Sequence, residues 1–175
     1  MSHLAKFMRL RILGFVVLSS LSCLLFLRNA DAQTGSWPTH SHDAQHTAVS
    51  TVSSQAMSKI HWQVPVDLDP PQGEIFIHYG SPLVTAANTV IVPVKTGKNS
   101  FRVEAHNGAT GARLWVLNTA YKAPSDGFMP GLGPTLFGSK LYIPDTAGGV
   151  TVRTNPDSMT GTVAHLYFYG QQNYR

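Results

Sequence analysis

The 175-residue sequence contains a single cysteine, Cys23, and this residue lies inside an apolar N-terminal run. The chain from residue 33 onward has no cysteine, so an exported domain would be stabilised by burial and sheet pairing without disulfides. A small disulfide-rich scaffold is therefore excluded. Basic residues after residue 32 are scattered, and the formal charge falls from +4 to +1 when residues 1–32 are left out. A nucleic-acid-binding face requires clustered lysine and arginine, so nucleic acid is not an expected partner.

The sequence also lacks the usual motifs of hydrolases and nucleotide-binding proteins. The nearest match to a Gly-x-Ser-x-Gly nucleophile elbow is Gly80-Ser81-Pro82-Leu83, which has no second glycine. The glycine-rich stretches at 130–134 and 147–150 lead into no helix whose N-terminal amides could bind a phosphate. We therefore assign no catalytic, cofactor-binding or metal-binding residue from motifs, and the balance is against an enzyme.

Residues 1–32 have the pattern of a secretory signal peptide. Lys6, Arg9 and Arg11 form a basic segment, residues 12–27 are largely apolar, and Ala30-Asp31-Ala32 is a small-x-small cleavage site. The alternative is an uncleaved anchor, because the apolar run approaches the roughly 17 to 25 residues that span a bilayer. The sequence thus predicts a signal helix, contact with the membrane only through this leader, and a periplasmic or secreted protein.

Beyond residue 33, short runs rich in valine, isoleucine and aromatics alternate with glycine, proline, asparagine, aspartate and serine. This pattern indicates an all-β fold with no convincing helix, and residues 52–58 are expected to form a loop or a single turn. The predicted strands cover residues 60–66, 75–79, 82–86, 89–95, 101–106, 113–118, 134–137, 140–145, 149–154 and 163–169.

One predicted hairpin, at residues 103–115, carries a recognisable repeat motif. Phe101, Val103 and Ala105 alternate along its first strand, and Gly108 and Gly111 are expected to permit positive φ in the turn. The hairpin resembles the pyrroloquinoline-quinone-type β-propeller repeat, whose blades end on Ala-x-[Asp/Asn]-x-x-Thr-Gly-x-x-x-Trp. The matching positions are Ala105, Asn107, Thr110, Gly111 and Trp115.

A second, partial copy of the pattern follows about one blade length later in the sequence. Gly80-Ser-Pro-Leu-Val with 88–93 resembles Gly133-Pro-Thr-Leu-Phe with 139–144, at offsets of 53 and 51 residues for the two segments. The second copy keeps Thr160-Gly161 but has no tryptophan at the expected spacing, so Phe168 and Tyr169 are expected to supply aromatic packing.

These repeats predict a partial β-propeller of four-stranded antiparallel, WD-like blades. A propeller has about four to eight blades, whereas the residues after 32 suffice for about three. The expected organisation is a signal peptide at 1–32, a lead-in segment and loop at 33–58, and incomplete propeller blades at 59–175. We therefore expect the N-terminal part of a longer propeller, produced by truncation or gene fragmentation.

The segment after the leader contains four residues that could bind a metal ion: His40, His42, Asp43 and His46. His46 and Asp43 would need a turn to converge with the other two, and the segment, with Trp37-Pro38, also resembles the structural strand before the first blade in this family. We therefore rank packing at the blade edge above zinc or copper binding.

The other candidate residues have structural explanations. Trp62 is expected to pack within a blade and Trp115 to dock between neighbouring blades rather than on a cofactor. The isolated acids are expected to be solvated loop carboxylates; they are Glu74, Glu104, Asp126 and Asp145.

The resemblance implies, first, an exported non-catalytic scaffold or binding module whose partners are proteins or envelope components. The alternatives are part of a quinoprotein dehydrogenase, with pyrroloquinoline quinone, calcium and an aspartate base, or a non-functional gene remnant. The lack of cysteine after residue 33 counts against the quinoprotein, because those enzymes carry a vicinal cysteine pair. No cofactor is therefore assigned.

Overall fold

A computed structural model of the chain describes residues 35–53, 56–70, 80–122, 132–145 and 148–168. The chain divides into two compact units, Met1–Gln33 and Thr34–Arg175, and the described residues belong to the second. The predicted signal helix and the predicted strand at 75–79 lie outside the described residues. Within the described ranges, no helix has the length and hydropathy needed to cross a membrane.

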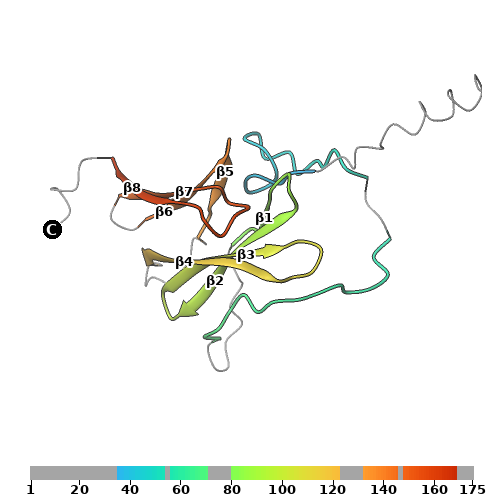
Figure 1. Cartoon of the computed structure of the whole chain (residues 1–175), viewed down its shortest axis with the longest axis horizontal. Coiled ribbons are helices and arrows are strands. Elements are labelled where there is room, and N and C mark those ends of the chain that lie inside the picture. The colour runs from blue at the N-terminus through green and yellow to red at the C-terminus, as the bar shows by residue number, and fades with distance from the viewer. Residues whose placement is uncertain (1–34, 54–55, 71–79, 123–131, 146–147, 169–175) are drawn as a thin grey trace, which may run out of the picture. The chain divides into compact units, whose positions relative to one another are not determined.

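The second unit contains two four-stranded antiparallel sheets, which confirms the all-β prediction (Figure 1). In each sheet the strands follow one another in chain order. The first sheet consists of β1 (Leu83–Val84), β2 (Thr89–Gly97), β3 (Ser100–Asn107) and β4 (Arg113–Lys122). The second consists of β5 (Thr135–Phe137), β6 (Lys140–Pro144), β7 (Gly149–Thr154) and β8 (Val163–Tyr167). All eight strands coincide with predicted strands, whereas the predicted count of about three blades stays a prediction.

The two sheets share one hydrophobic core. Alternate residues of β3 point into it: Phe101, Val103 and Ala105 are at most 3% exposed. Ala105 lies opposite Ile91 of β2 and Trp115 of β4 in the sheet register. The other buried members of this cluster come from β1, from the segment before β5 and from β6; they are Leu83, Leu132, Leu141 and Ile143.

The β3–β4 turn gives a physical reason for the repeat motif. The side-chain oxygen of Asn107 accepts hydrogen bonds from the amides of Ala109 and Thr110, each at 3.0 Å. Gly111 has a φ of +74°, as predicted. Gly108 is not at positive φ; it is required because a Cβ there would lie 2.5 Å from the backbone oxygen of Asn88.

Trp115 connects the two sheets, as the resemblance implied. Its indole Nε1 donates a 2.7 Å hydrogen bond to the backbone oxygen of Pro156, in the β7–β8 loop. The guanidinium carbon of Arg153, at the end of β7, lies 4.2 Å from the centre of the indole ring. Arg153 also donates a hydrogen bond to the backbone oxygen of Ser158 at 2.7 Å, and burial lowers the pKa of its guanidinium. The β7–β8 loop is therefore held against the first sheet.

The prediction of a sheet strand at residues 60–66 is wrong. Among the described residues, this part of the chain forms backbone hydrogen bonds to β2 only from Val66 and Leu68, both with Lys95. Trp62 nevertheless packs on the first sheet, as expected. Its indole Nε1 donates to the backbone oxygen of Gly108 at 2.8 Å, and its ring stacks on His106 with centroids 6.1 Å apart. The segment is thus attached through a side chain rather than through a ladder.

The second sheet departs from the first where the repeat motif weakens. His165 stands at the position that corresponds to Trp115, and its Nδ1 lies 2.9 Å from the hydroxyl of Thr151. The expected aromatic packing by Phe168 is wrong for the described residues, because its side chain is 75% exposed. Tyr169 lies outside the described residues.

Candidate ligand cavity

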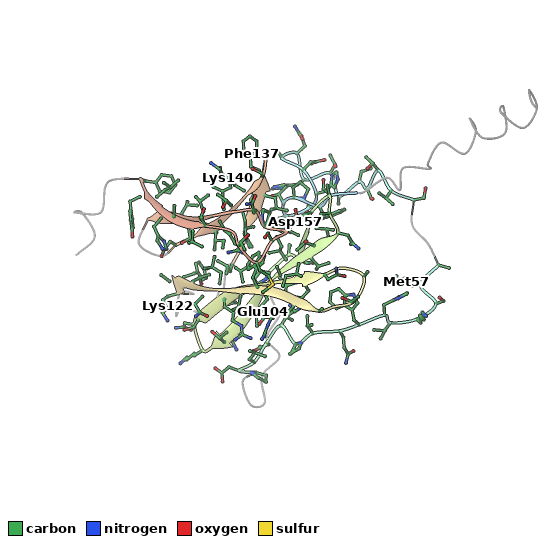
Figure 2. All side chains as sticks on the ribbon, in the orientation of Figure 1. Met57, Glu104, Lys122, Phe137, Lys140 and Asp157 are labelled. Carbon is green, nitrogen blue, oxygen red and sulfur yellow. The ribbon has the colours of Figure 1, made fainter. Side chains whose placement is uncertain are left out.

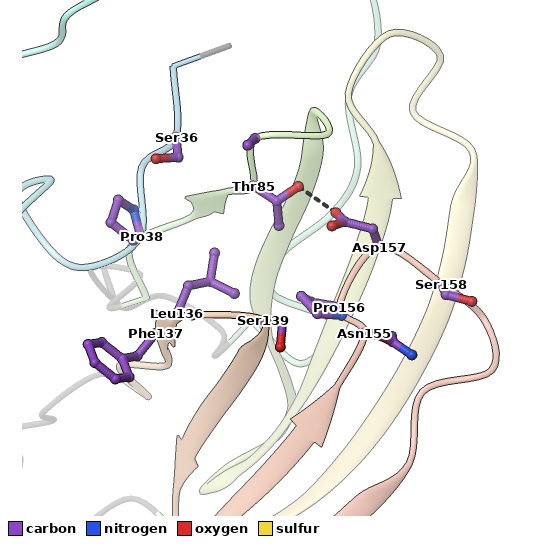
Figure 3. Close-up of a pocket in the computed structure, with 12 residues that line it drawn as sticks. Ser36, Pro38, Thr85, Leu136, Phe137, Ser139, Asn155, Pro156, Asp157 and Ser158 are labelled. Atoms are coloured by element: carbon purple, nitrogen blue, oxygen red, sulfur yellow. Dashed lines mark hydrogen bonds between the residues drawn. The ribbon is translucent and has the colours of Figure 1, made fainter.

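The two sheets and the lead-in segment surround a cavity of about 600 Å³ (Figure 3). Four short segments line it: the lead-in segment around Pro38, the β1–β2 turn, the β5–β6 hairpin and the β7–β8 loop. The polar lining residues are Ser36, Thr85, Ser139, Asn155, Asp157 and Ser158. The remaining lining residues are Pro38, Ala86, Leu136, Phe137, Gly138 and Pro156. Its volume falls within the roughly 300 to 1,000 Å³ of small-molecule sites.

A hydrogen bond between the two sheets crosses one side of the cavity. The hydroxyl of Thr85 donates to the carboxylate of Asp157, as Figure 3 shows. Thr85 is fixed in turn by β2, because its hydroxyl accepts from the amide of Thr89 at 3.1 Å and its amide donates to the carbonyl of Thr89 at 3.0 Å. Asp157 follows Pro156, whose carbonyl accepts from Trp115. The position of this carboxylate is therefore set from both sheets.

The lead-in segment is built into the opposite wall by backbone hydrogen bonds. Trp37 and Val84 exchange two of them, at 2.7 and 2.9 Å, on β1. The next residue, Pro38, accepts a 2.7 Å bond from the amide of Leu136 on β5. Trp37 is thus attached to β1 and Pro38 to β5, the first strands of the two sheets, and this wall of the cavity depends on both attachments.

The cavity offers hydroxyl groups, one amide and one carboxylate beside an apolar surface. None of its lining residues is a lysine, arginine or histidine. Phe137 is 77% exposed at the end of β5 (Figure 2), and Figure 3 shows its ring pointing away from the other lining side chains. Asp157 is the one acid among the lining residues, and it accepts the hydrogen bond of the Thr85 hydroxyl.

The four potential metal ligands of the lead-in segment contact one another in pairs: the rings of His40 and His46 have centroids 5.7 Å apart, and His42 Nδ1 is 3.5 Å from a carboxylate oxygen of Asp43. His40 Nδ1 is 2.8 Å from the Ser81 hydroxyl, next to β1, and the His42 ring packs edge-on against Trp37. Over the described part of the chain, no group of three or more potential metal ligands is brought together. The expected packing of this segment against the first strand is confirmed for Trp37 and His40.

Asp43 organises this loop. Its carboxylate accepts hydrogen bonds from the amide of Thr47, at 3.0 Å, and from the Thr47 hydroxyl. These bonds to Thr47 lower the pKa of the exposed Asp43 carboxyl to about 2. Ser41, His42, His46 and Ala48 adopt positive φ within the same loop. The aspartate therefore stabilises a tight, partly strained loop.

Glu104 was expected to be a solvated loop carboxylate, and this expectation is wrong. It lies on β3, is 5% exposed, and accepts a 2.7 Å hydrogen bond from Nε of Arg102. Its second oxygen is 3.1 Å from Nε2 of His106, which is 3% exposed beneath Trp62. The alternation of Arg102, Glu104 and His106 on one strand was the signal for a shared face. The ring of Trp62 stacks on His106, and we assign this buried cluster to packing.

The remaining predicted residues do not add to the cavity. Trp62 and Trp115 pack as described above. Asp145 is partly buried at the end of β6, where its amide donates to the carbonyl of Gly149 at 3.0 Å. Glu74 and Asp126 lie outside the described residues. Sequence reasoning missed Thr85, Phe137 and Asp157, because their relation depends on the approach of two sheets and not on local spacing.

Comparison with known proteins adds no assignment: no protein-family model matches the chain, and no curated protein matches it.

Proposed function

We propose that this chain is an exported, non-catalytic binding module of the β-propeller type, and that it binds its ligand in the cavity between the two sheets. The observation that carries the proposal is the construction of the cavity. Hydrogen bonds from Trp115, Thr85 and Trp37 fix three of its walls, so the groups that line it are preorganised.

The propeller assignment rests on the repeat resemblance and is supported by the two meander sheets. Trp115 docking on the β7–β8 loop is the contact that such a repeat requires between neighbouring blades. Export rests on the leader pattern of residues 1–32 and its cleavage site before Gln33. A periplasmic or secreted location follows, with proteins or envelope components as the partners that the resemblance implies.

The binding proposal is tested with protein made from the full-length gene and purified from the exported fraction. Mass spectrometry should give an N-terminus at Gln33. A library of small fragments, screened by two-dimensional amide NMR, should contain compounds that shift residues 85–86, 136–139 and 155–158. Fragments that shift only other residues, or none at all, would remove the cavity from the proposal.

A second measurement separates this function from the alternatives. Thermal melting with and without calcium plus pyrroloquinoline quinone should show one cooperative transition that the additives leave unchanged. A melting temperature raised by the cofactor would favour a quinoprotein, because a ligand that binds only the folded state stabilises it. Aggregated protein with no transition would favour a gene remnant.

A further inference from the structure

The outermost strands of the two sheets differ in how they are protected. The lead-in segment is hydrogen-bonded to β1 and to β5, the first strand of each sheet. β4, the last strand of the first sheet, carries Arg113 and Lys122, and two register shifts interrupt its pairing with β3. β8, the last strand of the second sheet, has no lysine, arginine, aspartate, glutamate or proline, and it pairs with β7 in unbroken register (Figure 1). Charge, proline and irregular pairing keep exposed strand edges apart, so β8 is an unprotected edge.

The backbone of β8 presents unpaired hydrogen-bonding groups along this edge. The amide of Phe168, just after the strand, donates to the carbonyl of Gly148 at 3.3 Å and therefore faces β7. Alternate residues of an antiparallel strand bond to the same neighbour, so the amides and carbonyls of Val163, His165 and Tyr167 point away from β7. No strand among the described residues lies on that side of β8.

The side chains of β8 are also uncovered on both faces of the sheet. Leu166 is 56% exposed and lies beside Val150 of β7 on one face. Val163 is 41% exposed on the other face, where the His165 ring is held by the Thr151 hydroxyl at 2.9 Å. Apolar side chains on a strand are stabilised by neighbours on an adjacent strand, and β8 has such neighbours on one side only.

We propose that β8 is a dimerisation strand, which pairs antiparallel with β8 of a second copy of this chain across a two-fold axis at His165. A two-fold axis brings the same edge of both copies together, so one closed contact satisfies both edges. A centre at His165 gives every outward-facing residue of the strand a partner: His165 bonds to His165 of the second copy, and Val163 to Tyr167. The two second sheets then form one continuous sheet.

The charges of the two outer strands favour β8 and a second copy as its occupant. An identical strand that approaches β8 meets no lysine, arginine or acid, so no like charges are brought opposite one another. Its apolar side chains also meet apolar ones, since Leu166 would lie beside Ala164 of the second copy. β4 has a positive residue at each end, Arg113 and Lys122, so an antiparallel pair of β4 strands would place like charges opposite one another.

The register is tested by cysteine cross-linking of protein made from the full-length gene with Cys23→Ser, which removes the one native cysteine. With oxidised glutathione, His165→Cys should form a disulfide-linked dimer, because Cα atoms of a hydrogen-bonded antiparallel pair are about 5.5 Å apart, within disulfide reach. Leu166→Cys alone should not cross-link, because it lies opposite Ala164 and diagonal to its own counterpart. An equal mixture of Ala164→Cys and Leu166→Cys proteins should cross-link.

Sedimentation velocity at increasing protein concentration measures the association itself. The parent protein should shift from monomer to dimer, and Leu166→Lys should weaken the dimer by roughly tenfold, since each copy loses an apolar cross-strand neighbour. Val116→Lys places the same charge on β4, at a valine that is 40% exposed, and should leave the dimer unchanged.

Three results would overturn the inference: folded protein that stays monomeric at every concentration, Leu166→Cys that cross-links as readily as His165→Cys, or Leu166→Lys and Val116→Lys that weaken the dimer equally. The residues of β8 do not line the cavity between the sheets. The outcome is therefore independent of ligand binding there.

Discussion

Replacing Trp115 should weaken the contact between the two sheets by an amount that the structure allows us to estimate. The side chain is 7% exposed and bonded to the Pro156 oxygen at 2.7 Å. Trp115→Ala removes the ring and leaves a cavity, which costs about 3 to 5 kcal/mol in a core. Trp115→Phe keeps a ring beneath Arg153 but removes the indole donor, and the loss of one partner of a buried bond costs about 1 to 3 kcal/mol.

The assay is urea unfolding at 25 °C followed by far-UV circular dichroism. For a domain of this size the slope is about 1 to 3 kcal/mol/M, so Trp115→Phe should lower the midpoint by about 1 M and Trp115→Ala by about 2 M. Val116→Ala is the control, since Val116 follows on the same strand, is 40% exposed, and should cost about 0.5 kcal/mol or less. The reasoning is refuted if Trp115→Ala costs no more than this control.

Three further predictions concern local structure. In urea unfolding, Gly108→Ala should lower the free energy of unfolding by about 1 kcal/mol or more beyond the loss caused by Gly138→Ala. A Cβ at Gly108 would lie 2.5 Å from the backbone oxygen of Asn88, whereas a Cβ at Gly138 would meet open space and only an unfavourable φ of +57°. Equal losses would contradict the structure. The Asp43 carboxyl should titrate near pH 2 by carbon-detected NMR, and Thr47→Val should move this pKa up toward the ordinary value of about 4. Because the folded-state pKa is lowered, the ionised carboxylate stabilises the folded loop above about pH 4, and this stabilisation is lost as the pH falls toward 2. An unshifted pKa of Asp43 in the parent protein would exclude its hydrogen bonds to Thr47. Glu104→Gln should lower the free energy of unfolding by about 2 kcal/mol or more in the same urea assay, since it removes the buried charge that faces Arg102 and the buried His106. A change below about 0.5 kcal/mol would contradict its burial.

The strands were predictable because their signals are local. Alternation of Phe101, Val103 and Ala105 fixed which face of β3 is buried, and the turn residues Asn107 and Gly111 marked where the chain reverses. The motif also predicted the role of Trp115 as a contact between sheets. Each of these inferences depends on residues within a few positions of one another.

Apart from the Trp115 contact, which the repeat motif implied, relations between distant segments could not be predicted from the sequence. The strand expected at 60–66 has the right alternation, but its partner strand is not supplied by the described chain, and Trp62 attaches it through a side chain. Glu104 belongs to a residue type that is usually solvated, but it is buried on β3, and Trp62 from this segment stacks on its partner His106. The cavity likewise exists only where Thr85 meets Asp157, 72 positions later in the chain.

The proposed function requires that the two sheets fold as one unit, since the cavity has walls from both. Native-state amide hydrogen exchange of the full-length protein, measured with increasing urea, tests this directly. The slowest amides of β3 and β7 should converge on the same free energy of opening, and Trp115→Phe should lower both values together. Exchange of β7 through a separate, lower-energy opening that leaves β3 protected and is unaffected by Trp115→Phe would contradict a cavity built between them.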